Sequence, residues 1–331
     1  MKIKYLSLFL ILTLNLSSQE HIIKFATLAP EGSTWIKLMR EYDEIIRKES
    51  GGKLGFKIYA GGVAGDEKDV LRKIKIGQYH SAGITGVGLG EISPQVRILD
   101  SPFLFRNHAE IDFVLKSLDE EFQNGFNQNG FILLGWAEVG FVYTFTNAPI
   151  YKISDLKNVK MWSWEGDPVA EATFKALNAN VFPLSITDVR TSLQTKLIDG
   201  FYTSPLAAIS LQWFTMVKYL HHYPLANAAG AVVVSKKEFD KLPPDLQKIL
   251  LVTGKQVMRK LTLQSRVDNE KSLQILKKKL QFTLPINEKE IVRYNEVGKN
   301  ARLLMADKLY SKDFMERIES VLSDYRAKNS K

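Results

Sequence analysis

Apolar and polar residues follow two spacings along the first third of the chain, one typical of strands and one of helices. In residues 32–50, apolar side chains recur at intervals of three and four, which predicts an amphipathic helix capped by Ser33 or Thr34. The alternation of predicted strands with predicted helices favours a mostly parallel sheet covered by helices. The predicted elements are a strand at 22–27, a helix at 32–50, a strand at 53–60, a helix at 65–77 and a strand at 81–85.

The same order returns in the second half, so the pattern predicts two α/β lobes. Between them, residues 131–147 read as two extended segments that cross from one lobe to the other, and 221–235 read as a return crossing. Residues 243–280 are helical in pattern nearly throughout, which gives a helix of roughly 55 Å that spans both lobes. The later elements are strands at 157–164, 180–184 and 200–203, and helices at 167–178 and 186–199.

The crossings define the expected domains. We expect residues 19–140 with 232–270 to form lobe I, and residues 141–231 with 271–331 to form lobe II. In open α/β sheets, ligands bind beyond the carboxyl ends of the strands. Strand ends in both lobes therefore predict a binding cleft between them.

The stretch KMWSWEGDP raises a specific question about that cleft. Strand spacing sends Trp162 and Trp164 to the same face at a strand end. They either line the cleft or pack in the core, and the balance favours lining more clearly for Trp162. Glu165 is a candidate for recognising an amine or hydroxyl, whereas Asp167 is better suited to cap the next helix.

Composition limits the class of protein. The chain has 331 residues, of which 45% are hydrophobic, and contains no cysteine, so its folded state rests on its core without disulfides. The formal net charge is +9, but the 45 basic residues are mixed with 36 acidic ones along helical stretches. This pattern indicates a solvated surface and does not favour nucleic-acid binding, which needs a concentrated basic patch.

The first eighteen residues have the features of a secretory signal peptide. Lys2 and Lys4 precede an apolar run from Leu6 to Leu16, and small residues follow. We expect cleavage after Ser18 and a periplasmic location. An uncleaved anchor is the alternative.

No catalytic constellation stands out. The chain lacks a cysteine nucleophile and the GxSxG and HExxH motifs, and the adjacent His221 and His222 would point to opposite faces of a strand. The glycines of 86–90 follow a strand but lack the spacing of a phosphate loop, which indicates a tight turn where backbone approaches something closely. We therefore predict a binding protein, not an enzyme, with no cofactor and no metal.

Six stretches in order carry a family resemblance, running from about Ile22 to Leu251. The chain resembles the DctP-type solute receptors of tripartite ATP-independent periplasmic (TRAP) transporters. The resemblance implies a two-lobed α/β periplasmic binding protein fold, cleft closure on a small-molecule solute, and delivery to the small and large permease subunits. The stretches are FATLAPEGSTW, GGVAGDEKDVLRKIKIGQYHSAGI, LDSPFLFRN, TNAPIYKISDLKNVKMW, FPLSITDVRTSLQTKLIDGF and VVVSKKEFDKLPPDLQKIL.

The chain departs from the family at the position of its carboxylate-binding arginine. That position holds Trp162, and Val142 occupies the place of a second arginine found in sialic-acid receptors of the family. The family's arginine clamps a substrate carboxylate with two hydrogen bonds. The substitution indicates a branch that binds an apolar or amphipathic solute. Arg190 is the nearest replacement cation, although exposure on a helix surface is its expected state.

The predicted ligand-binding residues come from strand ends in both lobes. A secreted sensory or interaction protein of the same fold, without a transport role, is the alternative function. The predicted residues are Thr27, Leu28, Asp66, Thr85, Gly86, Val87, Phe141, Tyr143, Trp162, Trp164, Glu165, Tyr202, Thr203 and Ser204.

Overall fold

The computed structural model describes residues 21–285 and 287–329, which fold around two mixed sheets. The predicted signal peptide lies outside the described residues. The first sheet has the order β2-β1-β3-β10-β4, and β10 runs antiparallel to both its neighbours. Its strands are β1 (His21–Thr27), β2 (Leu54–Tyr59), β3 (Ser81–Thr85), β4 (Phe131–Trp136) and β10 (Gly230–Ser235).

The second sheet has six strands in the order β11-β9-β5-β8-β6-β7. The β6 strand is parallel to β7 and β8, whereas β5 is antiparallel to β8 and β9. The expectation of mostly parallel sheets therefore fails at the strands that cross between lobes. The strands are β5 (Gly140–Thr146), β6 (Met161–Trp164), β7 (Val181–Leu184), β8 (Gly200–Thr203), β9 (Tyr219–Ala228) and β11 (Gln281–Thr283).

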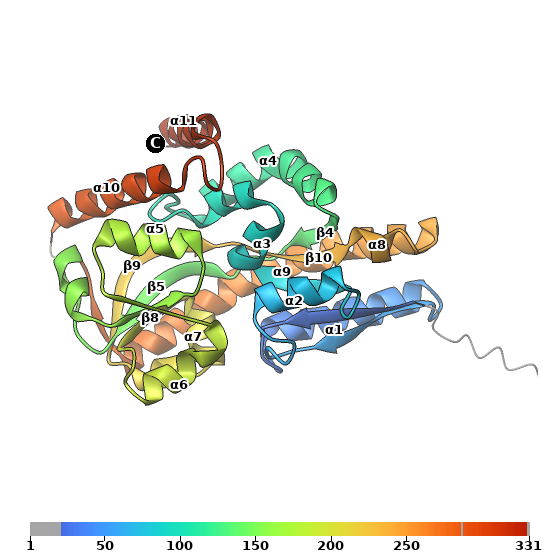
Figure 1. Ribbon diagram of the computed structural model, residues 1–331, viewed down its shortest axis with the longest axis horizontal. Coiled ribbons are helices and arrows are strands. Elements are labelled where there is room, and N and C mark those ends of the chain that lie inside the picture. The colour runs from blue at the N-terminus through green and yellow to red at the C-terminus, as the bar shows by residue number, and fades with distance from the viewer. Residues whose placement is uncertain (1–20, 286, 330–331) are drawn as a thin grey trace, which may run out of the picture.

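Two crossings connect the sheets where the sequence predicted them. The chain leaves the first sheet after β4 and enters the second at β5, then leaves β9 and returns directly into β10. Figure 1 shows the two sheets side by side, with β9 and β10 running from one into the other. These crossings confirm the two-lobed α/β architecture.

Helix α9 (Pro244–Lys279) is the long helix predicted from the sequence. Its 36 residues extend about 54 Å. It packs against α1 (Thr34–Glu49) in the first lobe and α7 (Pro205–Ser210) in the second. A Cβ at Gly254 would lie 2.6 Å from the Tyr42 hydroxyl, so this glycine lets the helix approach the first lobe closely.

The remaining helices cover the two sheets. Ser33 caps α1 by accepting a hydrogen bond from the Ile36 amide, which confirms one of the two predicted caps. The other α-helices of the described residues are α2 (Glu67–Lys75), α3 (Gly86–Ile92), α4 (His108–Gln128), α5 (Pro168–Leu177), α6 (Val189–Gln194), α8 (Lys236–Phe239), α10 (Glu288–Met305) and α11 (Lys312–Asn329).

The exact lobe boundaries remain a prediction. The chain passes from the first sheet to the second near 137–140 and returns near 229, close to the expected positions. At the C-terminal end, α10 contacts α5 of the second lobe, whereas α11 contacts α4 of the first (Figure 1). The predicted placement of 271–331 wholly in lobe II does not account for α11.

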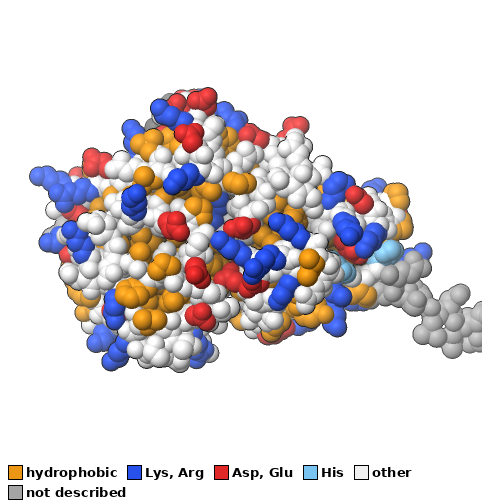
Figure 2. Space-filling model, viewed as in Figure 1, with side chains coloured by type: hydrophobic (Ala, Val, Ile, Leu, Met, Phe, Trp, Pro, Cys, Tyr) orange, Lys and Arg blue, Asp and Glu red, His pale blue; other side chains and the backbone are white. Residues whose placement is uncertain are grey.

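Charged side chains of both signs are mixed on the face in Figure 2, as the sequence pattern indicated. Among the residues that the structure describes, no helix combines the length and apolar character needed to cross a membrane.

Candidate functional site

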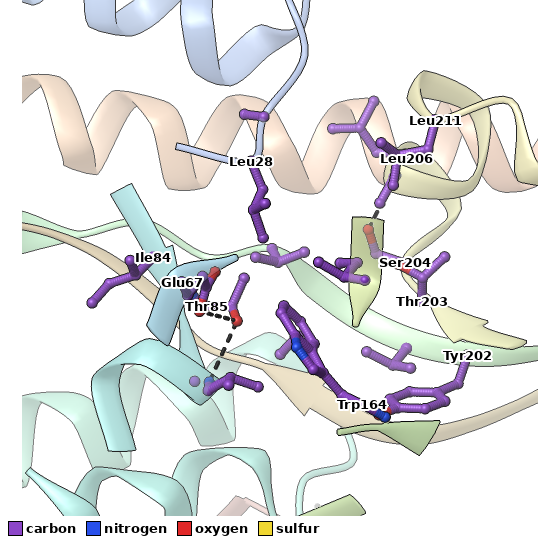
Figure 3. A pocket seen from close by; sticks show the side chains of 18 of the residues that line it. Leu28, Glu67, Ile84, Thr85, Trp164, Tyr202, Thr203, Ser204, Leu206 and Leu211 are labelled. Carbon is purple, nitrogen blue, oxygen red and sulfur yellow. Dashed lines mark hydrogen bonds between the residues drawn. The ribbon is translucent and has the colours of Figure 1, made fainter. Parts of the chain in front are cut away.

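A cavity of about 560 Å³ lies between the two lobes. Its walls come from strand ends and adjoining loops of both sheets, as a cleft at the carboxyl ends of strands requires. Figure 3 shows Leu28, Glu67 and Thr85 facing Trp164, Tyr202 and Thr203 across this space.

The structure brings most of the predicted ligand-binding residues together at this cavity. Their positions follow from the topology, since β1, β3, β6 and β8 all end there. The predicted residues that line it are Thr27, Leu28, Thr85, Gly86, Val87, Trp162, Trp164, Tyr202, Thr203 and Ser204.

Both tryptophans contact the cavity and the core at once. The Trp162 indole donates a hydrogen bond to the Leu184 carbonyl at 2.9 Å and stacks on the Tyr202 ring at 4.9 Å. The Trp164 indole donates to Asp66 Oδ2 at 3.1 Å. The two alternatives of lining and packing are therefore not exclusive, because each indole is wide enough to do both.

Two of the predicted aromatics, both on β5, lie outside the cavity wall. Val142 lines the cavity, whereas Phe141 and Tyr143 are absent from its wall. Phe141 packs against His108 at 5.0 Å, and Tyr143 stacks over His222 at 5.7 Å. Successive side chains on a strand point to opposite faces. Because Val142 faces the cavity, its neighbours Phe141 and Tyr143 face away from it.

Asp66 and Glu165 also lie outside the cavity wall. Asp66 caps α2 by accepting from the Glu67 amide, and its other oxygen accepts from Trp164 and from the Ser185 hydroxyl of the second lobe. Glu165 is exposed to solvent in the turn after β6. Asp66 thus holds the lobes together from beside the cavity.

Glu67 is a buried carboxyl in the cavity wall that the sequence analysis did not single out. It accepts hydrogen bonds from the Thr85 amide and hydroxyl and from the Gly88 amide, at 2.8–3.0 Å. Burial nevertheless raises the pKa of Glu67 to about 7. Its place among Asp66, Lys68 and Asp69 gave no sign that it alone would face inward.

A second buried group, the charged triad of Arg97, Asp100 and Asp167, lines the same cavity. Arg97 Nη2 lies 2.8 Å from Asp167 Oδ1, and Arg97 Nε lies 3.1 Å from Asp100 Oδ2. Asp167 also caps α5 through the Val169 amide, as predicted. Burial disfavours the charge on Arg97, but Asp167 and Asp100 raise its pKa overall.

The triad was missed, although the sequence held a signal. Arg97 and Asp100 are the charged positions of the otherwise apolar run VRILD, three residues apart and therefore close in a helical turn. They lie on a 3₁₀ turn (Pro94–Asp100). Burial raises the pKa of Asp100 to about 6, and the nearby guanidinium opposes that rise.

The glycine run of 86–90 is a helix and not the predicted turn. Thr85 caps α3 by accepting from the Val87 amide. A Cβ at Gly86 would lie 1.6 Å from Asp100 Oδ2, one at Gly88 would lie 2.9 Å from Glu67 Oε2, and one at Gly90 would lie 2.7 Å from Arg97 Cδ. The expectation of a close approach is thus confirmed, and what approaches is a charged side chain in each case.

Arg190 is exposed, as expected, and contributes to the outer wall of the cavity from α6. It therefore differs from Arg97, which is buried and already paired with two carboxylates.

Comparisons with known proteins agree with this arrangement. The model of the family "Bacterial extracellular solute-binding protein, family 7" (DctP) matches residues 25–305. A solute-binding protein of Verminephrobacter eiseniae is 28% identical over 214 residues, which cover 64% of this chain and 63% of that protein. The 2,3-diketo-L-gulonate-binding periplasmic protein of Escherichia coli K12 is 25% identical over 220 residues, 66% of either chain. These matches span slightly less than two thirds of the relatives' lengths.

Solved structures share the fold over nearly the whole chain. A TRAP periplasmic solute-binding protein from Haemophilus influenzae RdAW, bound to L-gulonate, superposes with a TM-score of 0.84 at 19% identity, covering 92% of this chain and 99% of that one. A protein from Pseudomonas putida F1 with bound D-glucuronate gives a TM-score of 0.80 at 23% identity, covering 90% and 97%.

Proposed function

Because this chain belongs to the bacterial extracellular solute-binding protein family 7, which comprises binding proteins and not enzymes, we propose that it is a receptor of a TRAP transporter. It captures a small solute in the cavity between its lobes and delivers it to the small and large subunits of a membrane permease. Its periplasmic location follows from the signal-like residues 1–18 and from the periplasmic location named for the E. coli relative.

The proposed ligand is an apolar or amphipathic solute, in contrast to the sugar acids bound by the structural neighbours. The observation that carries this proposal is the composition of the cavity wall at β5 and β6. Trp162 stands where the family resemblance implies a carboxylate-binding arginine, and Val142 stands at the second such position. A carboxylate brought into a closed cavity loses its hydration and needs a fixed cation to offset that loss.

The cavity offers no free buried guanidinium for that role among its described lining residues. Arg97 is buried but lies between Asp167 and Asp100, and Arg190 is exposed at the rim. Large indole and phenol rings instead give the site apolar surface that suits stacking and burial of a hydrocarbon.

Native mass spectrometry of the protein purified from its own periplasm tests the ligand class. The expected result is a co-purifying apolar or amphipathic molecule, lost on denaturation. A sugar acid in its place would contradict the proposed ligand, while leaving a receptor role intact.

N-terminal sequencing of the exported protein tests its processing. We expect the mature chain to begin near residue 19, and a chain that still begins at Met1 would contradict cleavage. Deleting the genes for the permease subunits tests the transport role. Unchanged solute uptake in the deletion strain would favour the sensory alternative.

A further inference from the structure

The inner end of the cavity carries an excess of buried carboxyl groups. Three of its lining residues are acidic, namely Glu67, Asp100 and Asp167, and each is at least nine-tenths buried. The cavity's one buried cation among the described residues is Arg97. When ionised, the three carboxyl groups outnumber Arg97 by two charges in a region shielded from water, and burial, which raises the pKa of Glu67 to about 7, reduces that excess near neutral pH.

Arg97 is already flanked by two carboxylates, which makes it a poor partner for an anionic ligand. Its Nη2 lies 2.8 Å from Asp167 Oδ1 and its Nε lies 3.1 Å from Asp100 Oδ2. A ligand carboxylate would have to displace one of these aspartates, or enter beside both and meet their charges. Either arrangement is unfavourable in a region of low dielectric.

Two buried oxygens at the same end have unused capacity to accept hydrogen bonds. Asn227 Oδ1 accepts no hydrogen bond from any residue within 21–285 and 287–329, and Asp100 Oδ2 lies 3.1 Å from Arg97 Nε as an ion pair without a hydrogen bond between them. Asn227 is only 2% exposed, and its amide nitrogen is turned toward the Leu99 carbonyl at 3.5 Å. Buried acceptors are normally satisfied, so a donor is missing from this end of the cavity.

The backbone around the acceptors is shaped to hold them in place. The Ala229 amide donates to Asp100 Oδ1 at 2.7 Å, which fixes the carboxylate. The missing side chain at Gly86 leaves the space that Asp100 Oδ2 occupies. The acceptor pair is thus a built feature of the fold and not a chance exposure.

On the basis of the proposed receptor function, we propose that the solute carries a cationic amine head group, which donates hydrogen bonds to Asp100 Oδ2 and Asn227 Oδ1. Its apolar body lies against Trp162 and Trp164. An ammonium group supplies both of the things that this end lacks, namely positive charge and hydrogen-bond donors. A hydroxyl supplies only a donor, and a carboxylate supplies neither.

Three probes of equal chain length test the head group: octylamine, 1-octanol and octanoate. Their binding is measured by calorimetry and by the fluorescence of the cavity tryptophans. We expect octylamine to bind at least tenfold more tightly than octanol, and octanoate to bind most weakly. The preference for octylamine over octanol should fall at least tenfold in Asp100→Asn, and octanoate should gain affinity because Arg97 loses one of its partners.

Asp240→Asn is the matched control, since Asp240 is an exposed carboxylate paired with Lys236 far from the cavity. It should leave all three affinities unchanged. Thermal melting checks that each variant folds. Should Asp100→Asn fail to fold, Asn227→Leu carries the same test by removing the other acceptor.

The outcomes separate this inference from the function on which it rests. Octanoate binding as tightly as octylamine, or an Asp100→Asn protein with an unchanged preference, would overturn the amine head group and leave the receptor function standing. Binding of none of the three probes would contradict the apolar ligand itself, and the amine inference with it.

Discussion

At the scale of single residues, the site depends on glycines that make room for charge. Gly86, Gly88 and Gly90 each lie against one charged side chain of the cavity. The glycine run, which resembles a loop signal, is therefore needed to make room for those side chains. Helix α3 forms despite three residues of poor helix propensity, because tertiary packing and the Thr85 cap outweigh that preference.

Replacing Gly86 with alanine should destabilise the protein by about 2–3 kcal/mol, since its Cβ would overlap Asp100 and force the buried triad apart. Urea denaturation measures the loss. A double-mutant cycle with Asp100→Ala provides the control. Because removing the Asp100 side chain also removes the clash, the double variant should lose less stability than the sum of the losses in the two single variants. Strict additivity would show that the glycine acts elsewhere.

Glu67 should make the empty protein less stable as the pH rises. Its pKa is about 7 when folded and 4.5 as an ordinary carboxyl, so the native state binds the proton more tightly. The free energy of unfolding gained from this proton is largest below pH 4.5 and is lost between about pH 4.5 and 7.

Urea denaturation at pH 5, 6 and 7 measures this slope. Glu67→Gln should flatten the decline, because glutamine has no proton to lose, whereas Glu120→Gln, on the exposed side of α4, should leave it unchanged. A decline of equal steepness in Glu67→Gln would assign it to other groups.

At the scale of elements, the alternation along β5 decides which residues face the ligand. Val142 lines the cavity, while its neighbours Phe141 and Tyr143 pack against histidines on the other face. Aromatic content alone is therefore a poor guide to the wall, since a strand buries side chains on both faces.

Val142→Trp should fill the cavity next to β5 and weaken octanol binding at least tenfold. Phe141→Ala and Tyr143→Ala should change that affinity less than about twofold, although each should lower the melting temperature by removing ring contacts. Calorimetry and thermal melting measure the two effects separately. A larger affinity loss in Phe141→Ala than in Val142→Trp would reverse the orientation of the strand.

At the scale of the whole molecule, Asp66 joins the two lobes beside the cavity. It belongs to α2 of the first lobe and accepts hydrogen bonds from Trp164 and Ser185 of the second. Arg97 and Asp167 make a further contact between the lobes. Closure by a hinge is the motion typical of periplasmic binding proteins, and these bonds favour the closed state.

Ser185→Ala should shift the empty protein toward the open state by removing one bond between the lobes, worth about 1 kcal/mol. Small-angle X-ray scattering should show a larger radius of gyration, and ligand affinity should fall about fivefold. Ser117→Ala is the control, since Ser117 is exposed on α4 and bonds only within its own helix. An unchanged radius together with unchanged affinity would exclude a role in closure.

The sequence by itself determined the order of strands and helices, the two crossings, the 36-residue helix and the convergence of strand ends on one cavity. These features follow from local periodicity and from the direction of strands, which short stretches encode. Tertiary structure decided which face of β5 lines the cavity, that Glu67 is buried there, and that Asp167 joins Arg97 and Asp100, whose spacing the stretch VRILD does show. Arg97 and Asp167 are 70 residues apart in the chain. Their pairing depends on the packing of two lobes, and no local pattern records it.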